Sequence, residues 1–514
     1  MEEQPSLKKE MRTLFTIAWP IALTIACNFG MQLTDLIMVG HLLQPKNLAG
    51  ASLGVTWINC VTCWVRRGFA PSISVLCAQA FGAGKKELVG LWFQCGLVVM
   101  VLLVIPIALA LYFGEYLFSA ISKDEQVAAD AALYCRWSIL GVLPQNVYYA
   151  LQFYFQAQRI VRPDMYISVI SLGLNVLLAY FMTKSMGFEG SPIATSIIKL
   201  VKPVLLLLWC VVIKKLHRPT WPGWRLREAL QVQKLKVYVL QQSAPLGFGN
   251  SVEEWQRELL AFLAARLGPD ELAVQNCMLS VYFFVSSAPI GLLFAVMNRV
   301  SFLLGASTPQ AAQQMQKISL LLFAALGLVN AVVLVLVRDV VGKLFTIGST
   351  NTTIVEEAAF ISAFCGCCYL FLSVFYLCVA VLRGQARPTP LSWSLFIGNW
   401  PVAVPLAYVC AFRLQLGVKG LWIGMMSGYL VTTCLLCFFT WRSNWPDLAL
   451  KASKRNAHKQ PLLAPDPERK EDEQGTLVAE EEESSSCVPH PHQLPAPSSS
   501  PRWAGKDSRK PSIQ

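Results

Sequence analysis

One helix, Pro245-Leu-Gly-Phe-Gly-Asn-Ser-Val-Glu-Glu-Trp-Gln-Arg-Glu-Leu-Leu-Ala-Phe-Leu-Ala-Ala-Arg-Leu-Gly268, constrains how the remainder of the chain is built. It begins with a proline, ends at a glycine and shows no β-type alternation of apolar and polar residues. Long apolar segments lie on both sides, so we expect this helix to cross a membrane. It nevertheless carries Glu253, Glu254, Arg257 and Glu258. Because an ionisable group at the bilayer centre costs about 2.5–3.5 kcal/mol, such groups usually face a wet cavity and serve a function.

These charges allow two interpretations. On a helix, Glu254 and Glu258 share a face, and Arg257 can pair with Glu253 or with Glu254. In the first interpretation the charges neutralise one another as a structural ion-pair cluster inside a helix bundle. In the second, the carboxylates bind a cation and a proton in a transporter. The residues of this helix alone leave both interpretations open.

Composition indicates the same class of protein as this helix. Hydrophobic residues make up 54% of the 514 residues and charged residues 14%, and the mean hydropathy is +0.48, unlike soluble globular proteins. Apolar runs of about 20 residues recur along the chain, each long enough to cross a bilayer. The 16 cysteines are scattered, many of them within these runs, where cysteine packs as a small hydrophobe. We therefore expect an all-α polytopic membrane protein with neither a disulfide framework nor a metal site.

The expected architecture is twelve transmembrane helices arranged as two six-helix pseudo-symmetric bundles. We place the spans at 13–39, 48–80, 88–113, 127–157, 163–184, 190–213, 237–267, 271–305, 317–337, 358–382, 391–413 and 417–441. The domains are then a cytoplasmic N-terminus at 1–12, an N-terminal bundle at 13–213, a cytoplasmic linker at 214–236, a C-terminal bundle at 237–441 and a cytoplasmic tail at 442–514. The tail is rich in Ser, Pro, Glu and Lys and cannot bury enough apolar surface to fold, so we expect it to be disordered.

The two halves of the chain repeat each other at a nearly constant offset. Paired positions include Pro20 with Pro245, Gly82-Ala83-Gly84 with Gly305-Ala306-Ser307, Arg162-Pro163 with Arg387-Pro388, and Leu178-Ala179-Tyr180 with Leu406-Ala407-Tyr408. Six spans followed by six spans preserve orientation, so the repeat is parallel, about an axis along the membrane normal. Secondary transporters use such duplications to rock two bundles around a central site. A receptor or a scaffold has no need of one.

Basic residues predict the orientation. Lys and Arg gather in alternate loops, on the side that also holds both termini, so we expect both termini to be cytoplasmic. The sequon Asn351-Thr352-Thr353 follows the ninth span and falls on the opposite side, which makes Asn351 a glycosylation candidate. The formal charge of +12 is explained by this distribution rather than by nucleic-acid binding. We expect residence in the plasma membrane or in a vacuolar or vesicular membrane.

Several motifs give the chain a family resemblance. They include Asp35-Leu-Ile-Met-Val-Gly40-His41, Leu48-Ala-Gly-Ala-Ser-Leu-Gly54, Gln79-Ala-Phe-Gly-Ala-Gly84, Leu272-Ala-Val-Gln275, Pro289-Ile-Gly291 and Val381-Leu-Arg-Gly-Gln385. In this order and spacing, from about Pro20 to Trp441, the chain resembles the multidrug and toxin extrusion (MATE) family of eukaryotic type. The resemblance implies two six-helix lobes around a cavity and export of organic compounds, often cationic drugs or toxins. It also implies a proton or a sodium ion as the coupling ion, with no other cofactor.

The resemblance also indicates which residues form the site. Glu253 and Glu258 fall on the acidic positions of the family's seventh helix, Asp35 on an acid of the first helix and Asn175 on an asparagine of the fifth. The residues that we expect to bind substrate or proton are Glu253, Glu258, Asp35, Glu254, Asn175, Gln275, Trp255 and Tyr282. The aromatic members would add cation–π contacts, although packing or lipid contact explains each of them equally well.

The chain departs from the family pattern at several places. Arg66-Arg67 lies about halfway along the second span, where the family is apolar or small, and this pair could bind Asp35 or an anionic substrate. Further acids that animal-type members carry are replaced here by Ser280 and Leu372, and an acid of some prokaryotic members by Ala179. These departures leave the charge of the substrate open.

Three functions are therefore compatible with the sequence. The first is proton-coupled export of small organic cations and xenobiotics by a monomer in the lipid bilayer. The second is a sodium-coupled or organic-anion exporter of the same family. The third is a transport-inactive membrane scaffold whose tail recruits partners. An enzyme is not expected, because the chain has no phosphate-binding loop, no nucleophile elbow and no metal-binding His spacing.

Overall fold

The computed structural model describes residues 7–121, 124–340 and 352–457, and within these ranges every regular element is a helix. This confirms the all-α fold class. Helices are the expected result for apolar spans, because in lipid each backbone N–H and C=O must be satisfied within its own segment. The predicted glycosylation site Asn351 and residues 458–514 of the predicted tail lie outside the described residues.

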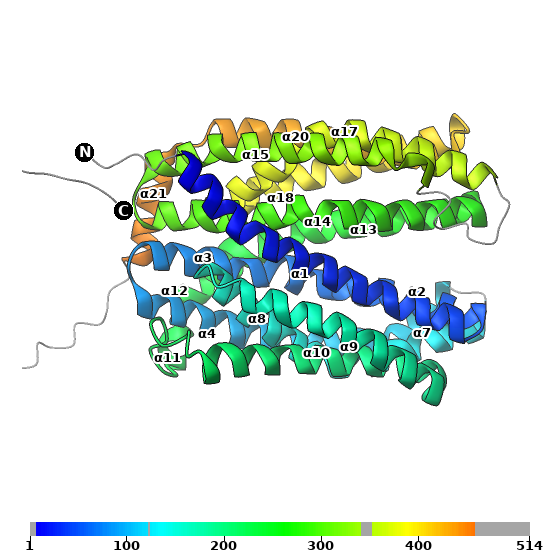
Figure 1. Cartoon of the computed structure of the whole chain (residues 1–514), viewed down its shortest axis with the longest axis horizontal. Coiled ribbons are helices and arrows are strands. Elements are labelled where there is room, and N and C mark those ends of the chain that lie inside the picture. Colours follow the sequence, from blue (N-terminus) through cyan, green and yellow to red (C-terminus); the bar gives the residue numbers. More distant parts are fainter. Residues whose placement is uncertain (1–6, 122–123, 341–351, 458–514) are drawn as a thin grey trace, which may run out of the picture. The chain divides into compact units, whose positions relative to one another are not determined.

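Six predicted spans, each built of one to three consecutive helices, make up the N-terminal half, which Figure 1 shows in blue to green. They are α1 (Leu7–Leu42); α2 (Pro45–Trp64), η1 (Val65–Phe69) and α3 (Ala70–Gly82) in line; α4 (Lys86–Leu102) with α5 (Val104–Tyr112) and α6 (Gly114–Ile121); α7 (Glu125–Ser138) with η2 (Ile139–Gly141) and α8 (Val142–Ala157); α9 (Arg162–Met186) with η3 (Gly187–Glu189); and α10 (Gly190–Leu207) with η4 (Leu208–Ile213). Two short helices, α11 (Leu226–Ala229) and α12 (Val232–Leu235), lie in the linker between the halves.

The C-terminal half repeats this plan. Its helices are η5 (Lys236–Ser243) with α13 (Ala244–Leu267), α14 (Pro269–Gly305), α15 (Pro309–Leu336), α17 (Thr352–Gly384), α18 (Pro388–Ile397) with η6 (Gly398–Ala403), α19 (Val404–Tyr408) and η7 (Val409–Arg413), and α20 (Gly417–Trp441). A further helix, α21 (Trp445–Asn456), follows the last span.

Nine helical stretches in the described ranges are long and apolar enough to cross a membrane, and one of them, 162–213, contains both α9 and α10. The two predicted spans missing from this set, 127–157 and 237–267, are helical as well. The second of these contains α13, whose charged residues lower its hydropathy. The helices therefore agree with the twelve predicted spans.

The pseudo-symmetry is visible where the two halves cross. A Cβ atom added to Gly82 would lie 2.0 Å from the backbone oxygen of Phe302, and one added to Gly305 would lie 2.0 Å from that of Gln79. The two contacts are equivalent under the sequence repeat, and only glycine permits so close a backbone approach. The ends of α3 and α14 thus pack reciprocally, as the repeat predicts.

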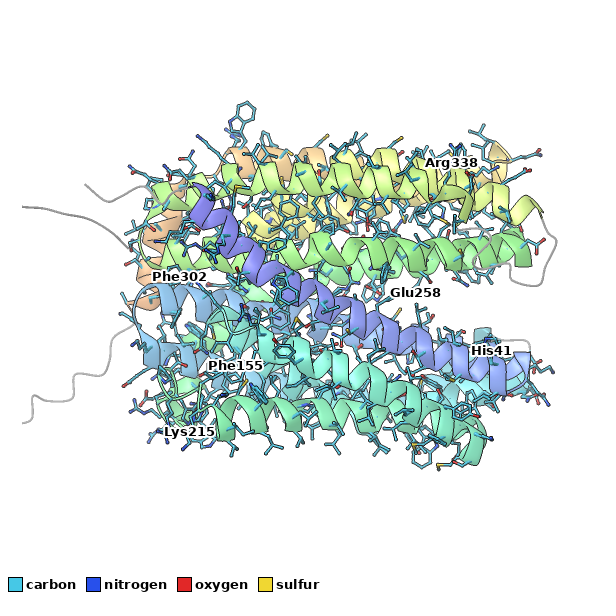
Figure 2. The ribbon with its side chains drawn as sticks, in the orientation of Figure 1. His41, Phe155, Lys215, Glu258, Phe302 and Arg338 are labelled. Carbon is cyan, nitrogen blue, oxygen red and sulfur yellow. The ribbon has the colours of Figure 1, made fainter. Side chains whose placement is uncertain are left out.

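The described chain begins and ends at the same end of the helices (Figure 1). Near the start of α1, Glu10 forms an ion pair with Arg299 of α14, and α21 packs against α3, α14 and α15. Lys215 lies toward this end, whereas His41 and Arg338 lie toward the other (Figure 2). An even number of spans requires this arrangement. That the shared end is cytoplasmic stays a prediction.

The predicted disorder of 442–514 is wrong for its first part. Helix α21 is amphipathic, and it buries Trp445, Leu448, Ala449 and Ala452 in the core of the C-terminal half. The Asn444 side chain caps its N-terminus by accepting a hydrogen bond from the backbone N–H of Asp447. The composition of the tail as a whole is polar, so it gave no indication of this short apolar face. The structured protein therefore extends beyond the last span.

Candidate substrate and proton site

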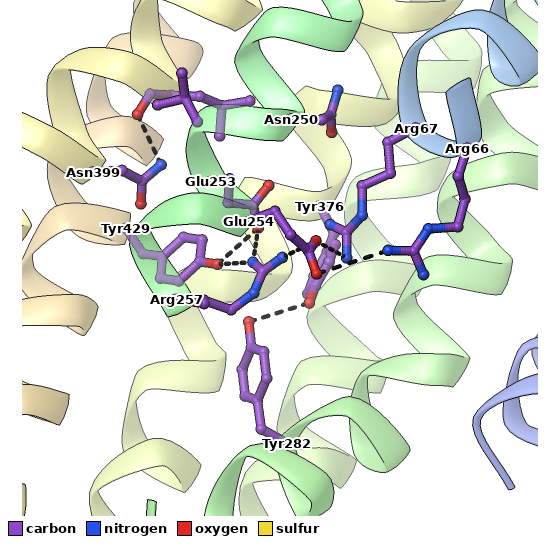
Figure 3. Close-up of polar contacts among 12 residues, drawn as sticks. Arg66, Arg67, Asn250, Glu253, Glu254, Arg257, Tyr282, Tyr376, Asn399 and Tyr429 are labelled. Carbon is purple, nitrogen blue, oxygen red and sulfur yellow. Dashed lines mark hydrogen bonds and ion pairs between the residues drawn. The ribbon is translucent and has the colours of Figure 1, made fainter. Parts of the chain in front are cut away.

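Three charged residues of α13 form an ion-pair cluster (Figure 3). Nη1 of Arg257 donates to Oε1 of Glu253 over 2.7 Å, and Nη2 donates to Oε2 of Glu254 over 2.6 Å. These residues are one turn apart, so the i,i+4 and i,i+3 spacing of the helix brings them together. Arg257 is 4% exposed, and its guanidinium lies 5.4 Å from the centre of the Phe283 ring. The pairing predicted from the sequence is confirmed, and Arg257 holds both partners at once.

The cluster extends across the two halves of the protein. Nη2 of Arg67 lies 2.7 Å from Oε2 of Glu254, and Nη2 of Arg66 lies 3.7 Å from Oε1 of the same carboxylate. Both arginines belong to η1, a π-helical turn within the second span. Asp35 instead has partners on α9 and α10, so the suggested pairing of the arginines with Asp35 is not what the structure shows. The Arg67–Glu254 pair ties the second span to the seventh.

A tyrosine of the twelfth span completes the shell of Glu253. The Tyr429 hydroxyl donates to Oε1 of Glu253 over 2.8 Å. Tyr429 was not predicted from the sequence, because a single tyrosine in an apolar span carries no distinctive pattern. Glu253 and Glu254 are thus both paired with arginine, which supports the structural interpretation for these two acids.

Glu258 is different from the other two acids of α13. It lies half-buried, partway along the helices (Figure 2). Among the residues that the structure describes, no Lys, Arg or His nitrogen lies within 4.0 Å of its carboxylate. Glu258 is therefore free to exchange its partner in a way that Glu253 and Glu254 are not.

The predicted aromatic residues separate into two groups. Tyr282 is buried, with its hydroxyl 3.4 Å from that of Tyr376 and its ring edge-on to Trp422. It lies beside Arg257 in the close-up (Figure 3). Trp255 is 38% exposed although both of its neighbours in sequence are buried, so it lies on the outward face of α13. This favours lipid contact for Trp255 over contact with a substrate.

Asp35 and Asn175 meet in a second polar group, inside the N-terminal half. Nδ2 of Asn175 donates to Oδ1 of Asp35 over 3.0 Å, and Oγ1 of Thr195 donates to Oδ2 over 2.8 Å. Asp35 is 4% exposed. Asp35 and Asn175 were both predicted as site residues from the sequence, whereas Thr195 was not. Gln275 is buried on α14, and its Oε1 accepts no hydrogen bond from the described residues.

A third polar group was not predicted at all. Asp164 of α9 accepts hydrogen bonds from Tyr148 and from Gln152 of α8. Nearby, Nζ of Lys202 donates to Asn28 over 2.6 Å and lies 4.3 Å from the centre of the Tyr148 ring. An acid and a lysine inside predicted spans were the available signal, because such residues are rare in membrane segments. This group connects α1, α8, α9 and α10.

Known proteins resemble the chain in sequence and in fold. The MatE family model matches residues 20–181 and 245–409, one block in each half. Protein DETOXIFICATION 37 of Arabidopsis thaliana is 28% identical over 88% of this chain and 90% of its own length. Multidrug and toxin extrusion protein 1 of Xenopus tropicalis is 26% identical over 87% and 77%. The crystal structure of the eukaryotic MATE transporter AtDTX14 superposes with a TM-score of 0.79 at 23% identity, covering 88% of this chain and 99% of that one.

The family of the chain follows from these matches together with the helix arrangement. The two matched blocks coincide with the two halves of the sequence repeat, and the superposed transporter shares the fold over almost its whole length. No enzyme activity is implied, because the members of this family are transporters. The chain belongs to the MatE family of multidrug and toxin extrusion transporters.

Proposed function

We propose that this transporter exports organic cations in exchange for protons and that Glu258 is the acid that carries the proton. The observation behind the proposal is the difference among the three acids of α13. Arg257 binds both Glu253 and Glu254, and Arg67 also binds Glu254. Glu258 forms no ion pair with any described residue, so a proton or a substrate cation does not need to displace an arginine there.

Coupling follows from competition at this carboxylate. An organic cation stabilises the ionised carboxylate of Glu258, and a proton neutralises it. The two ligands therefore exclude each other at one site, so the binding of each weakens the binding of the other and the coupling free energy between them is unfavourable. If each is released on the opposite side of the membrane, the proton gradient drives export. No further machinery is required.

The arginine pairs have a different part in this proposal. Arg67 and Glu254 belong to the two halves that must move relative to each other in a rocking-bundle mechanism. Their ion pair joins the second and seventh spans in this conformation and leaves Glu258 without an arginine partner. Glu253 and Glu254 are then positioning residues, and Glu258 is the binding residue.

Sodium coupling is a second candidate because of the group around Asp35. A carboxylate, a hydroxyl and an amide oxygen meet there, and hard cations prefer oxygen ligands. Oδ1 of Asn175 is buried and accepts no hydrogen bond from the described residues. Asp35 itself is held by Asn175 and Thr195, which are neutral donors. The site would thus accept either a proton or a sodium ion.

Transport by the full-length protein in proteoliposomes distinguishes these candidates. The measurement is accumulation of tetraethylammonium inside the proteoliposomes, driven by an imposed proton gradient or, separately, by an imposed sodium gradient. We expect the proton gradient alone to drive accumulation against the concentration of the cation. Accumulation with the sodium gradient alone would indicate that the coupling ion binds at Asp35. No movement of tetraethylammonium with either gradient would favour a transport-inactive scaffold.

We also propose a location and an orientation for the protein in the cell. It is a multi-pass monomer in the plasma membrane or in a vacuolar or vesicular membrane, and both of its termini are cytoplasmic. The shared end of α1 and α21 supports the common side of the termini. Antibodies against a tail epitope should bind permeabilised cells and fail to bind intact cells.

A further inference from the structure

The guanidinium of Arg66 has two buried nitrogens that the protein leaves without a hydrogen-bond acceptor. Its Nε and Nη2 atoms are buried and make no hydrogen bond with any described residue. The Glu254 oxygen nearest to Nη2 lies at 3.7 Å, which is too long for a hydrogen bond. The neighbouring Arg67 approaches the same carboxylate to 2.7 Å. Buried polar groups are nearly always hydrogen-bonded, so a guanidinium held only by this long ion pair requires an explanation.

Glu254 does not hydrogen-bond to Arg66 in this structure. Its Oε2 atom accepts a hydrogen bond from Nη2 of Arg257 over 2.6 Å and forms an ion pair with Nη2 of Arg67 over 2.7 Å. Both arginines approach that one oxygen. The other oxygen of Glu254, Oε1, lies 3.7 Å from Nη2 of Arg66. A fourth arginine, Arg383, donates a hydrogen bond to Asn250 of α13 over 2.7 Å. Four arginines on or beside α13 thus meet its three glutamates, Glu258 included, and positive charge is in excess when all of them are ionised.

Arg66 is also placed where a ligand can reach it. It lies on the π-helical turn η1, a geometry that recurs at functional sites because it changes the direction of side chains within a helix. Its side chain is 30% exposed. Helix α13, which carries Glu258, packs against η1, which carries Arg66. A carboxylate that can bind a cation and a guanidinium that can bind an anion therefore lie on two helical elements that pack together.

We propose that Arg66 binds an oxyanion, such as a carboxylate or a sulfonate, of the transported compound. The guanidinium fork matches the two oxygens of such a group and binds them in a bidentate manner. This rests on the role proposed above for Glu258: together the two residues make the site dipolar, so it favours organic cations that also carry an anionic group over cations that do not. Arg66 is then the residue that determines specificity, and Glu258 the residue that determines coupling.

A matched pair of ligands tests this inference. One is a fluorescent rhodamine with a free carboxylate beside its cationic ring system, and the other is the same dye as its methyl ester, which keeps the cation and loses the anion. We expect the wild-type protein to bind the carboxylate form about tenfold more tightly or better, since hydrogen bonds between charged groups are worth at least this much. R66Q should remove this preference and leave affinity for the ester within about twofold. R66K, which keeps the charge but loses the fork, should give an intermediate preference.

Fluorescence anisotropy on the purified full-length protein measures these affinities without any need for transport. R136Q is the matched control, because Arg136 is an exposed arginine paired with Glu115, away from the site, and this variant should keep the wild-type preference. Equal affinity of the wild type for both dyes, or equal loss of both in R66Q, would overturn the inference. Failure of both dyes to move under a proton gradient would instead refute the proposed coupling, and the ratio of the two affinities would still decide the role of Arg66.

Discussion

Nη1 of Arg455 donates to Oε1 of Gln79 over 2.9 Å, and this bond joins the helix after the last span to the N-terminal half. Its neighbour Asn456 donates to the backbone oxygen of Gln79 over 3.2 Å and accepts a hydrogen bond from Lys85 over 2.8 Å. The other contacts of α21 are with α14 and α15 of the C-terminal half. Helix α21 therefore bridges the two halves at the end where Gly82 and Gly305 cross.

Replacing Arg455 should loosen this bridge. Burial lowers the pKa of the Arg455 guanidinium to about 10, so the group is still charged at pH 7. We expect R455A to destabilise the protein by about 1–2 kcal/mol through loss of a hydrogen bond to a charged donor. Thermal unfolding of the purified protein measures this. K451A is the control, because Lys451 is exposed and pairs only within α21, where such pairs contribute little. An equal shift in both variants would show that the effect is not the bridge to Gln79.

Truncation should distinguish α21 from the residues that follow it. A chain that ends after residue 457 keeps the whole of α21, and we expect it to insert and transport like the full chain. A chain that ends after residue 444 exposes the surface against which Trp445 and Leu448 pack. Each large apolar side chain buried there contributes about 1.5–3 kcal/mol, so the shorter chain should aggregate in detergent or lose transport. Size-exclusion profiles and proteoliposome efflux report both effects. Equal behaviour of the two truncated chains would mean that α21 is dispensable.

The sequence predicted the helices and the local contacts well. Spans follow from the length of apolar runs, and the repeat of Gly82 with Gly305 correctly indicated an equivalent pair of helix ends. The Arg257–Glu253 pair was predictable because both residues lie on one helix, with fixed spacing. Contacts of this kind depend only on the geometry of a single element.

The contacts between helices were not predictable. Arg67 and Glu254 are far apart in the sequence, and their meeting depends on the rotation and depth of two helices, which apolar patterning does not define. Thr195 and Tyr429 were missed for the same reason, because a hydroxyl in an apolar span gives no signal until its partner is placed beside it. Helix α21 was missed because its few apolar residues are averaged with a long polar tail.

Removing the Glu254 carboxylate should be the most destabilising change in the ion-pair cluster. E254Q leaves Arg67 without its partner and removes one of the two carboxylates with which Arg257 pairs. Breaking a buried pair by removing one partner costs about 3–5 kcal/mol, because an uncompensated charge remains. E253Q should cost less, since Arg257 keeps Glu254. Adding R67Q to E254Q should restore part of the stability, and E115Q, at an exposed pair, should change it by less than about 1 kcal/mol. Thermal unfolding that ranks E253Q as worse than E254Q would contradict this order.

Glu258→Gln tests the coupling site most directly. Glutamine keeps nearly the same volume, but it neither titrates nor attracts a cation. Because Glu258 is paired with no arginine, its replacement strands no charge, and we expect normal expression and a normal thermal midpoint. Efflux driven by a proton gradient should fall at least tenfold, and the pH dependence of transport should flatten.

The control for this variant is E125Q, which removes an acid from the exposed first turn of α7 and should keep wild-type efflux. D35N is the informative comparison. If Glu258 carries the proton, D35N keeps some pH-dependent transport, because Asn at position 35 can still hydrogen-bond to Thr195 and the competition at Glu258 remains. Wild-type efflux from E258Q with an unchanged pH profile, together with loss of coupling in D35N, would remove Glu258 from the mechanism. The exchanged ion would then bind at Asp35, between Asn175 and Thr195.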